Sequence, residues 1–445
     1  MPEHRLQPAA QRLLEAEYDN MLACVRCGLC HSVCPTYQQS FIEPEGPRGR
    51  IAIARALTEG HLGLSPDLLS HWDNCILCNA CSAVCPSGVN MEAIGLALRA
   101  AVTESQPSGA GFGLEAGLRL LLPHMDRMRA AAGLGRVYQH SGLQSLVRGS
   151  GLLKLLGLQD VEAMMPVIDA EPLVPAGQVW EPLGQPFGMA LREPQDIAQD
   201  RPHATVAMLA GCVMSTLFSD TDRATARVLA ANGCRVLLPA NQGCCGALHA
   251  HRGEQKLAQE LARRNIDAFE KEHVDAIIVN AAGCGATMKQ YAHLLKDDPA
   301  YAARAGALAA KVKDFSEFLD GLGPLPPTHA VKLTVTYQEP CHLAHAQGIR
   351  EAPRRLLRSI PGLELVEMGE SAMCCGSGAL YNLTQAESSE ALRTRKVRKA
   401  LATGAEVIVT ANPGCLIQLS QGLREAGSSA QVVHIADLLD RAYGG

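Results

Sequence analysis

The sequence lacks a net positive charge, a long apolar run and an export signal, and each absence excludes a class of protein. The formal net charge is −5 and the pI is near 6.3, which argues against a broad basic surface for nucleic acid. No stretch reaches the roughly 18 apolar residues that a membrane-spanning helix needs. The start of the chain, MPEHRLQPAAQRLLEAEYDN, has acidic residues, Pro and Gln where an export signal would be apolar. We therefore expect a cytoplasmic protein, and peripheral contact with the cytoplasmic face of the inner membrane remains open.

Aromatic residues are scarce, whereas cysteine is abundant. The 445 residues include 7 Phe, 8 Tyr and 2 Trp but 17 Cys. The hydrophobic fraction of 47% and the charged fraction of 19% are those of a globular protein, and the length predicts two to four structural units. In the reducing cytoplasm, clustered cysteines favour metal ligation over disulfides.

The first 105 residues contain two cysteine runs with the same spacing, C-x-x-C-x-x-C-x-x-x-C-P. In this pattern three cysteines of one run hold a 4Fe-4S cluster, and the fourth cysteine ligates the cluster of the other run. We therefore predict a first ferredoxin-type set that consists of Cys24, Cys27, Cys30 and Cys85. The second ferredoxin-type set consists of Cys75, Cys78, Cys81 and Cys34.

Zinc is the main alternative for these runs, but structural zinc sites use pairs of C-x-x-C and give no reason for a triplet followed by C-P. Two neighbouring clusters form a relay for electrons, and the region has no nucleophile–base pair. The segment between the runs, Glu45-Gly46-Pro47-Arg48-Gly49-Arg50, carries two arginines, and a helix is expected over residues 49–60. They could donate to cluster sulfurs, meet a carboxylate on a partner or remain solvated. His31, between two ligands, is expected to be a surface residue.

From about residue 203 the sequence alternates short β-branched runs with longer helical stretches. Strands are expected over residues 206–213, 234–239, 276–280 and 406–412, with a helix near 221–232. Such alternation predicts a parallel sheet covered by helices. The preceding residues 106–200 have no cysteine; amphipathic helices are expected there at 114–122 and 143–158, before a Pro-rich linker.

The second half of the chain is duplicated around the motif Cys-Cys-Gly (CCG). Four cysteines of each copy repeat at displacements of 129, 130 and 131 residues. The first quartet comprises Cys212, Cys244, Cys245 and Cys284, and the second quartet comprises Cys341, Cys374, Cys375 and Cys415. All lie at expected strand ends or in the turns that follow, where ligands gather in parallel α/β sheets, so each quartet is a candidate site for a metal or a cluster.

Two other interpretations of the quartet cysteines, a disulfide and inert core packing, fit the sequence less well. A disulfide between adjacent cysteines is strained, and eight cysteines in register do not fit inert core packing. Cys234 has no counterpart in the other copy and is expected in the core. The histidines near these turns, His249, His251, His342 and His345, could be ligands or proton carriers, although a hydrogen-bonded structural role is favoured for each.

These motifs resemble iron–sulfur proteins with a two-cluster ferredoxin domain and two CCG domains, and most closely the glycolate oxidase iron–sulfur subunits. The resemblance is carried by Cys24-Val25-Arg26-Cys27-Gly28, Gly46-Pro47-Arg48-Gly49-Arg50-Ile51, Cys85-Pro86-Ser87-Gly88-Val89, Gly243-Cys244-Cys245-Gly246-Ala247, Gly283-Cys284-Gly285-Ala286, Cys374-Cys375-Gly376-Ser377 and Thr410-Ala411-Asn412. It implies an electron-transfer subunit of a glycolate dehydrogenase complex. FAD-binding partner subunits would oxidise glycolate to glyoxylate, and electrons would pass through two 4Fe-4S clusters to a quinone or another acceptor.

The resemblance also defines what this chain is not expected to do. It has no Gly-x-Gly-x-x-Gly at a strand-to-helix turn, so no substrate-oxidising flavin site is expected on it. The CCG domains of heterodisulfide reductase end in C-x-x-C, whereas here Thr287 and Gln418 stand at the fifth-cysteine positions. This departure counts against a thiol–disulfide reductase, while four thiolates still suffice for zinc or an ordinary cluster. The iron–sulfur subunit of anaerobic glycerol-3-phosphate dehydrogenase remains an alternative.

The predicted architecture is therefore α+β and multidomain. Residues 1–105 form a mainly helical two-cluster domain, and residues 106–200 form a helical and Pro/Gly-rich linker. Residues 201–325 and 326–445 form two α/β CCG modules with parallel sheets.

Overall fold

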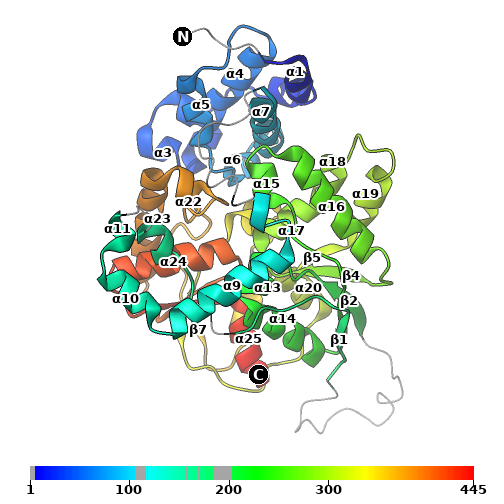
Figure 1. Ribbon diagram of the computed structural model, residues 1–445, viewed down its shortest axis with the longest axis vertical. Coiled ribbons are helices and arrows are strands. Elements are labelled where there is room, and N and C mark those ends of the chain that lie inside the picture. Colours follow the sequence, from blue (N-terminus) through cyan, green and yellow to red (C-terminus); the bar gives the residue numbers. More distant parts are fainter. Residues whose placement is uncertain (1–5, 106–116, 118, 156–158, 169, 184–202) are drawn as a thin grey trace.

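The computed structural model describes the chain except for residues 1–5, 106–116, 118, 156–158, 169 and 184–202. Figure 1 shows the N-terminal region in blue at the top of the molecule, above the two halves of the C-terminal region in green and in orange to red. No helix in the described ranges has the length and apolarity to cross a membrane.

The N-terminal region consists of short helices around an apolar core. The elements are α1 (Pro8–Glu15), α2 (Tyr18–Leu22), η1 (Leu29–Val33), α3 (Tyr37–Ser40), η2 (Glu43–Glu45), α4 (Pro47–Thr58), α5 (Pro66–Asp73), α6 (Ala80–Ala83) and α7 (Met91–Ser105). Helix α4 agrees with the helical stretch expected between the two cysteine runs, and it begins with Pro47, which is favoured in the first helical turn. Its Ile51 packs with Leu14, Trp72 and Ile94 in the buried core.

The segment after residue 118 is more helical than its sequence indicated. It forms α9 (Met125–His140), α10 (Leu143–Gly149), α11 (Leu152–Leu155), α12 (Gln159–Ala163) and the short strand β1 (Gln178–Trp180). Helix α9 was not predicted. The helix expected at 143–158 is divided between α10 and α11, because Gly151 adopts a left-handed backbone with φ of +74°. The helix expected at 114–122 lies partly outside the described residues.

The first CCG module contains a five-stranded sheet of order β1-β3-β2-β4-β5. The further strands are β2 (Ala204–Met208), β3 (Cys234–Leu238), β4 (Ala276–Val279) and β5 (Val312–Asp314). All pairs are parallel except β1 with β3. The edge strand β1 comes from residues that precede the predicted start of the module at 201. The helices are α13 (Val213–Leu217), α14 (Ser219–Ala231), α15 (Ala247–His251), α16 (Gln255–Phe269), α17 (Ala282–Lys289), α18 (Tyr291–Leu294), α19 (Ala302–Lys311) and α20 (Phe315–Leu322).

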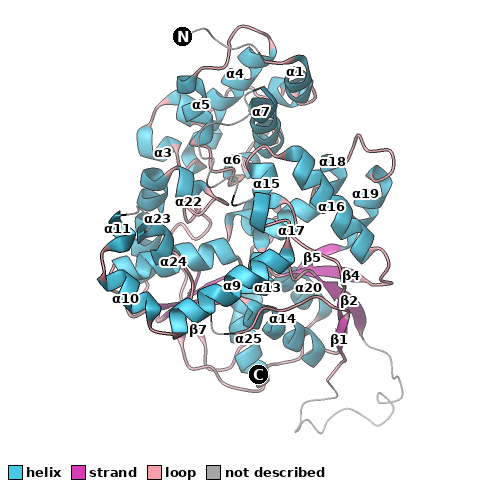
Figure 2. Ribbon diagram, viewed as in Figure 1, coloured by secondary structure: helices cyan, strands magenta, loops and turns pink. Residues whose placement is uncertain are grey.

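The second CCG module contains a four-stranded parallel sheet of order β7-β6-β8-β9. Its strands are β6 (Thr334–Tyr337), β7 (Glu364–Leu365), β8 (Val407–Thr410) and β9 (Gln431–His434). Its helices are η4 (His342–Ala346, a π-helix), α21 (Glu351–Arg358), α22 (Tyr381–Thr384), α23 (Ala386–Leu401), α24 (Pro413–Glu425) and α25 (Ile435–Tyr443). Figure 2 shows helices around the strands.

The fold class predicted from the sequence is confirmed: a helical N-terminal region precedes α/β modules with parallel sheets. The expected strands are present with shorter ends. Cys234 is fully buried in β3, as expected for a core residue. One continuous apolar core joins the two modules, since Val206 and Ile278 of the first cluster with Val335 and Val409 of the second.

Candidate metal centres

The first ferredoxin-type set meets in one cavity beside α4. Its wall includes all four predicted cysteines, Cys24, Cys27, Cys30 and Cys85, together with Cys81. Thus Cys85, 51 residues from its counterpart Cys34, lies with the triplet of the other run. This is the exchanged arrangement that the spacing suggests for two-cluster domains.

The second ferredoxin-type set lines an adjacent cavity, whose wall includes Cys34, Cys75, Cys78 and Cys81. The two cavities share Pro47, Cys81 and Met91 in their walls, so they are direct neighbours. Two groups of soft thiolates that converge on neighbouring cavities fit a pair of 4Fe-4S clusters.

Left-handed backbone residues wrap each run around its cavity. In the first run Arg26 and Gly28 have φ values of +56° and +84°, and the corresponding Leu77 and Asn79 have +52° and +62°. Gly adopts this conformation without steric cost and Asn tolerates it, whereas Arg and Leu rarely do. The same strained backbone at equivalent positions of both runs indicates that the loops are shaped for a bound group.

Burial opposes ionisation of these thiols in the absence of a bound cation. Desolvation raises the pKa of Cys30 to about 11, and it also raises the pKa values of Cys78 and Cys81. A metal ligand must be a thiolate, so the positive charge of coordinated iron would reverse this preference. Binding of iron at these cysteines would therefore require the release of their protons.

A buried ion pair holds the loop that carries Cys34. The Arg50 side chain is 1% exposed and donates to Glu45 Oε2 at 2.8 Å, to Thr36 Oγ1 at 3.0 Å and to the His71 carbonyl at 2.8 Å. Thr36 Oγ1 lies 3.4 Å from Cys34 Sγ. Arg50 is thus neither solvated nor free for a partner, and it positions the loop of one predicted ligand.

Arg48, the other arginine of this segment, is placed differently. It is one-third exposed, pairs with Glu43 at 2.7 Å and donates to the Arg26 carbonyl at 3.1 Å. His31 stacks on Tyr37 with ring centroids 4.0 Å apart, and its side chain is only 12% exposed. The expected surface position of His31 is therefore wrong, because Tyr37 and the following turn cover the ring.

The CCG turns hold their cysteine pairs in buried positions, and the four residues Cys244, Cys245, Cys374 and Cys375 are only 1–3% exposed. Gly246 and Gly376 have φ values of +86° and +91°, which favour glycine. A Cβ on Gly376 would also lie 2.6 Å from the Ser389 carbonyl. Both turns thus need glycine, and they place the preceding cysteine pairs next to the cysteines at the strand ends.

The sulfur atoms within each quartet are close but not bonded. Cys212 Sγ lies 3.6 Å from Cys244 Sγ, and the second quartet has separations of 3.9 Å between Cys341 and Cys374 and 3.4 Å between Cys375 and Cys415. A disulfide would require about 2.05 Å. Thiolates around a single zinc ion with Zn–S bonds of about 2.3 Å stand about 3.8 Å apart. The three measured separations are thus closer to those around a single metal ion than to a disulfide bond.

Both quartets face one cavity, an arrangement that the sequence did not reveal. The cavity has a volume of about 320 Å³, and its wall includes all eight quartet cysteines. Backbone contacts bring the two modules together beside it: Ala282 donates to the Ala411 carbonyl at 3.1 Å, and Gly283 donates to Asn412 Oδ1 at 3.2 Å. The repeat predicted two separate groups of cysteines, and in the structure both groups line the same cavity.

The second quartet also adjoins the second ferredoxin-type set. Cys78 packs in one buried cluster with Cys341 and Cys374. The four groups of cysteines thus follow one another, from the first ferredoxin-type set to the second, then to the second quartet and across the shared cavity to the first quartet.

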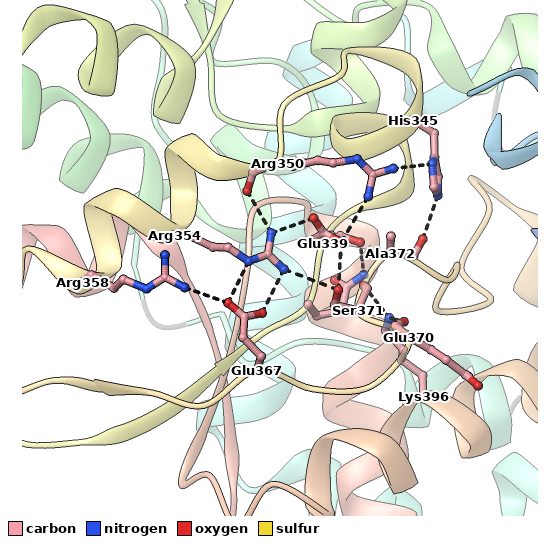
Figure 3. A network of polar contacts seen from close by, with 11 residues as sticks. Glu339, His345, Arg350, Arg354, Arg358, Glu367, Glu370, Ser371, Ala372 and Lys396 are labelled. Atoms are coloured by element: carbon pink, nitrogen blue, oxygen red, sulfur yellow. Dashed lines mark hydrogen bonds and ion pairs between the residues drawn. The ribbon is translucent and has the colours of Figure 1, made fainter. Parts of the chain in front are cut away.

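A polar network supports the loop that precedes Cys374 (Figure 3). The fully buried Lys396 donates from Nζ to the carbonyls of Glu370 and Ser371 at 2.7 and 2.6 Å. Arg354 bridges Glu339 at 2.7 Å and Glu367 at 2.8 Å. Burial lowers the pKa of Lys396 to about 8, although the neighbouring thiols oppose this shift. Beside the first quartet, neutral Asn265 donates from Nδ2 to the Cys244 carbonyl at 2.9 Å.

Two of the four singled-out histidines have hydrogen bonds that account for them. His249 Nδ1 contacts Glu254 at 2.6 Å, and His345 Nε2 donates to the Ala372 carbonyl at 2.9 Å. His251 and His342 instead line the eight-cysteine cavity. His249 and His345 therefore have the hydrogen-bonded structural role that the sequence predicted for each histidine.

Known families match four ranges of the chain. Residues 20–89 match the 4Fe-4S dicluster domain, residues 206–289 and 335–420 match the cysteine-rich CCG domain, and residues 115–165 match the linker region of the glycolate oxidase iron–sulfur subunit. The chain thus carries the iron–sulfur cofactor type that its two runs predicted.

Two relatives of similar length give the same result. The chain is 40% identical to a probable glycolate oxidase iron–sulfur subunit of Bacillus subtilis, over 98% of this chain and 96% of that protein. It is 33% identical to the glycolate oxidase iron–sulfur subunit of Escherichia coli, over 97% and 96%. It is also 32% identical to lactate utilization protein A of an Exiguobacterium species, over 53% of this chain and 96% of that protein.

Proposed function

Because the chain belongs to the family of glycolate oxidase iron–sulfur subunits, we propose that it carries electrons between FAD-binding partner subunits and a terminal acceptor. The partners oxidise glycolate to glyoxylate, and a quinone or another acceptor receives the electrons. The observation that carries this proposal is the succession of adjacent cysteine sites through the molecule. Bound 4Fe-4S clusters supply one-electron redox chemistry in the two ferredoxin-type cavities.

The first ferredoxin-type set is the favoured docking point for a flavin subunit. Cys27 is exposed, and apolar side chains surround this end of the chain of sites: Val25 is 69% exposed, Leu29 55% and Val84 40%. An exposed apolar patch is typical of a surface that binds another protein. A partner seated there would cover these side chains and approach the first cavity closely.

Each CCG quartet binds a metal centre in this proposal. The buried sulfur pairs and the convergence of eight cysteines on one cavity support it. Metal analysis of the purified chain separates the options. About 8 irons per chain together with zinc indicate a zinc-stiffened scaffold, and about 12 or more irons indicate further clusters, at four irons per cubane.

The compartment proposed is the cytoplasm, with peripheral contact at the inner membrane where a quinone is the acceptor. None of the 17 cysteines, all within the described residues, forms a disulfide, which suits a reducing compartment.

Co-purification with neighbouring flavoproteins tests the substrate. The expected complex contains flavin and iron, and glycolate bleaches its visible absorption. Reduction by glycerol-3-phosphate instead of glycolate would support the anaerobic glycerol-3-phosphate dehydrogenase alternative, and reduction by lactate alone would move the substrate to another 2-hydroxy acid. Cleavage of disulfide substrates by the isolated chain would favour a heterodisulfide-reductase-like role.

A further inference from the structure

Three side chains from three parts of the molecule meet at its centre. Glu92 is on α7, His251 ends α15 after the first CCG turn, and His342 begins η4 after Cys341. Glu92 Oε1 lies 4.0 Å from His251 Nε2 and 3.9 Å from His342 Nε2. One donor atom of each residue lies within 4.8 Å of the others. Figure 1 shows two of these elements, with α7 above α15.

The Glu92 carboxylate is buried without a fixed cation. The residue is 5% exposed, and its Oε2 accepts from Asn79 Nδ2 at 2.6 Å and from Gln290 Nε2 at 2.8 Å. In the described part of the chain, the two imidazoles are the only basic side chains within 4.0 Å of it. A buried carboxylate is costly unless a cation or further hydrogen bonds compensate it.

Each imidazole has one buried nitrogen without a partner among the described residues, whereas the other nitrogen of His342, Nδ1, lies 3.6 Å from Cys341 Sγ. His342 Nε2 and His251 Nδ1 are buried and have no hydrogen-bond partner, and the His251 side chain is 7% exposed. The separations of 3.9 and 4.0 Å from Glu92 exceed hydrogen-bond length. Buried polar atoms without partners are rare in native proteins and indicate a missing ligand or ion.

We propose that Glu92, His251 and His342 bind one divalent first-row transition ion, Zn²⁺ or Fe²⁺. Two imidazoles and one carboxylate form a known donor set for both ions, which leaves coordination positions open. With bonds of about 2.0 Å, donor atoms around a tetrahedral ion stand about 3.3 Å apart, so closure needs shifts of about 1 Å. The ion would balance the buried carboxylate and satisfy His342 Nε2, and His251 would contribute Nε2, the nitrogen that faces Glu92.

The position of this site gives the ion a connecting role. Glu92 lines the cavity of the second ferredoxin-type set, and the two histidines line the eight-cysteine cavity. Glu92 and His251 also line a separate cavity of about 370 Å³ between α1, α7 and α18, which offers the ion a route inward. One ion would therefore tie the N-terminal region to both CCG modules, between two groups of cysteine sites.

The test is metal analysis of the full-length protein. Iron–sulfur clusters of the 4Fe-4S type contain equal iron and sulfide, so the relevant quantity is zinc plus iron in excess of acid-labile sulfide. Glu92→Gln and His251→Gln should each lower this quantity by about one ion per chain, as expected for loss of one ligand. Their sulfide content should equal that of the wild type. His345→Gln, which changes a histidine of η4 outside the cluster, should retain the ion.

Unchanged metal in both variants, relative to wild type and His345→Gln, would overturn the proposal. Should a variant lose sulfide as well, chelator-treated wild type is titrated with Co²⁺. Cobalt bound by nitrogen and oxygen ligands absorbs visible light but has no thiolate charge-transfer bands. Cobalt uptake that produces thiolate bands alone would also overturn the proposed site. A low sulfide content in the wild type and in every variant would refute the proposed iron–sulfur relay. The zinc and iron in excess of sulfide could still be compared between the variants.

Discussion

Substitution of Arg50 by methionine should destabilise the N-terminal region and disturb the second ferredoxin-type set. Removing one partner of a buried ion pair costs about 3–5 kcal/mol, because the other charge stays buried. Glu45 would still accept from Asn74 at 2.6 Å and contact His71 Nδ1 at 2.6 Å. These contacts place the expected cost at the lower end, about 3 kcal/mol. Thr36, which touches Cys34 Sγ, would lose its Arg50 donor.

Arg48→Met is the matched control, two residues away in the same segment. Its pair with Glu43 is exposed on both sides, 33% and 45%, so its loss should cost at most about 1 kcal/mol. Anaerobic urea unfolding of the full chain, followed by visible cluster absorption, measures both variants. With m values of about 1–3 kcal/mol/M, the Arg50 variant should shift the midpoint by about 1–3 M. Equal midpoints for the two variants would refute the structural role of the buried pair.

Three further outcomes are expected. Cys34→Ala should alter the paramagnetic resonance signal of the second ferredoxin-type set and spare that of the first; loss of the first signal alone would contradict the exchanged ligands. Cys245→Ala and Cys375→Ala should lower the metal content and the melting temperature, whereas Cys234→Ala should lower the free energy of unfolding by only about 1 kcal/mol. Identical metal content and melting temperatures in all three variants would refute metal binding by the quartets. Burial lowers the pKa of His434 to about 4, so the free energy of unfolding should be highest above about pH 6.5 and fall by about 3 kcal/mol toward pH 4. The variant His434→Gln should show a smaller pH dependence in denaturant titrations.

The sequence was most informative where function depends on spacing and local conformation. The two cysteine runs and the duplicated quartets predicted groups of thiols that the structure brings together. The helix from Pro47 to Thr58 and strands such as Cys234–Leu238 were expected within a few residues, because their apolar patterns and breakers are local.

Features that depend on packing between distant segments were not visible in the sequence. Strand β1 joins the sheet from a segment that its composition marks as a linker, and Arg50 looks like any other exposed arginine. The cluster of Glu92, His251 and His342 joins residues up to 250 positions apart, so no spacing rule could assemble it. The shared cavity likewise follows from the joint core of the two CCG modules.

The most direct test of the proposed relay is rapid mixing of glycolate with the assembled complex, with flavin and cluster reduction followed separately. In the wild-type complex, flavin reduction should precede cluster reduction and steady turnover with a quinone analogue. In Cys30→Ser and Cys81→Ser complexes the flavin should still be reduced, but delivery to the acceptor should be lost, because serine oxygen is a poor ligand for cluster iron. Full turnover with the quinone analogue in both variant complexes would contradict the account.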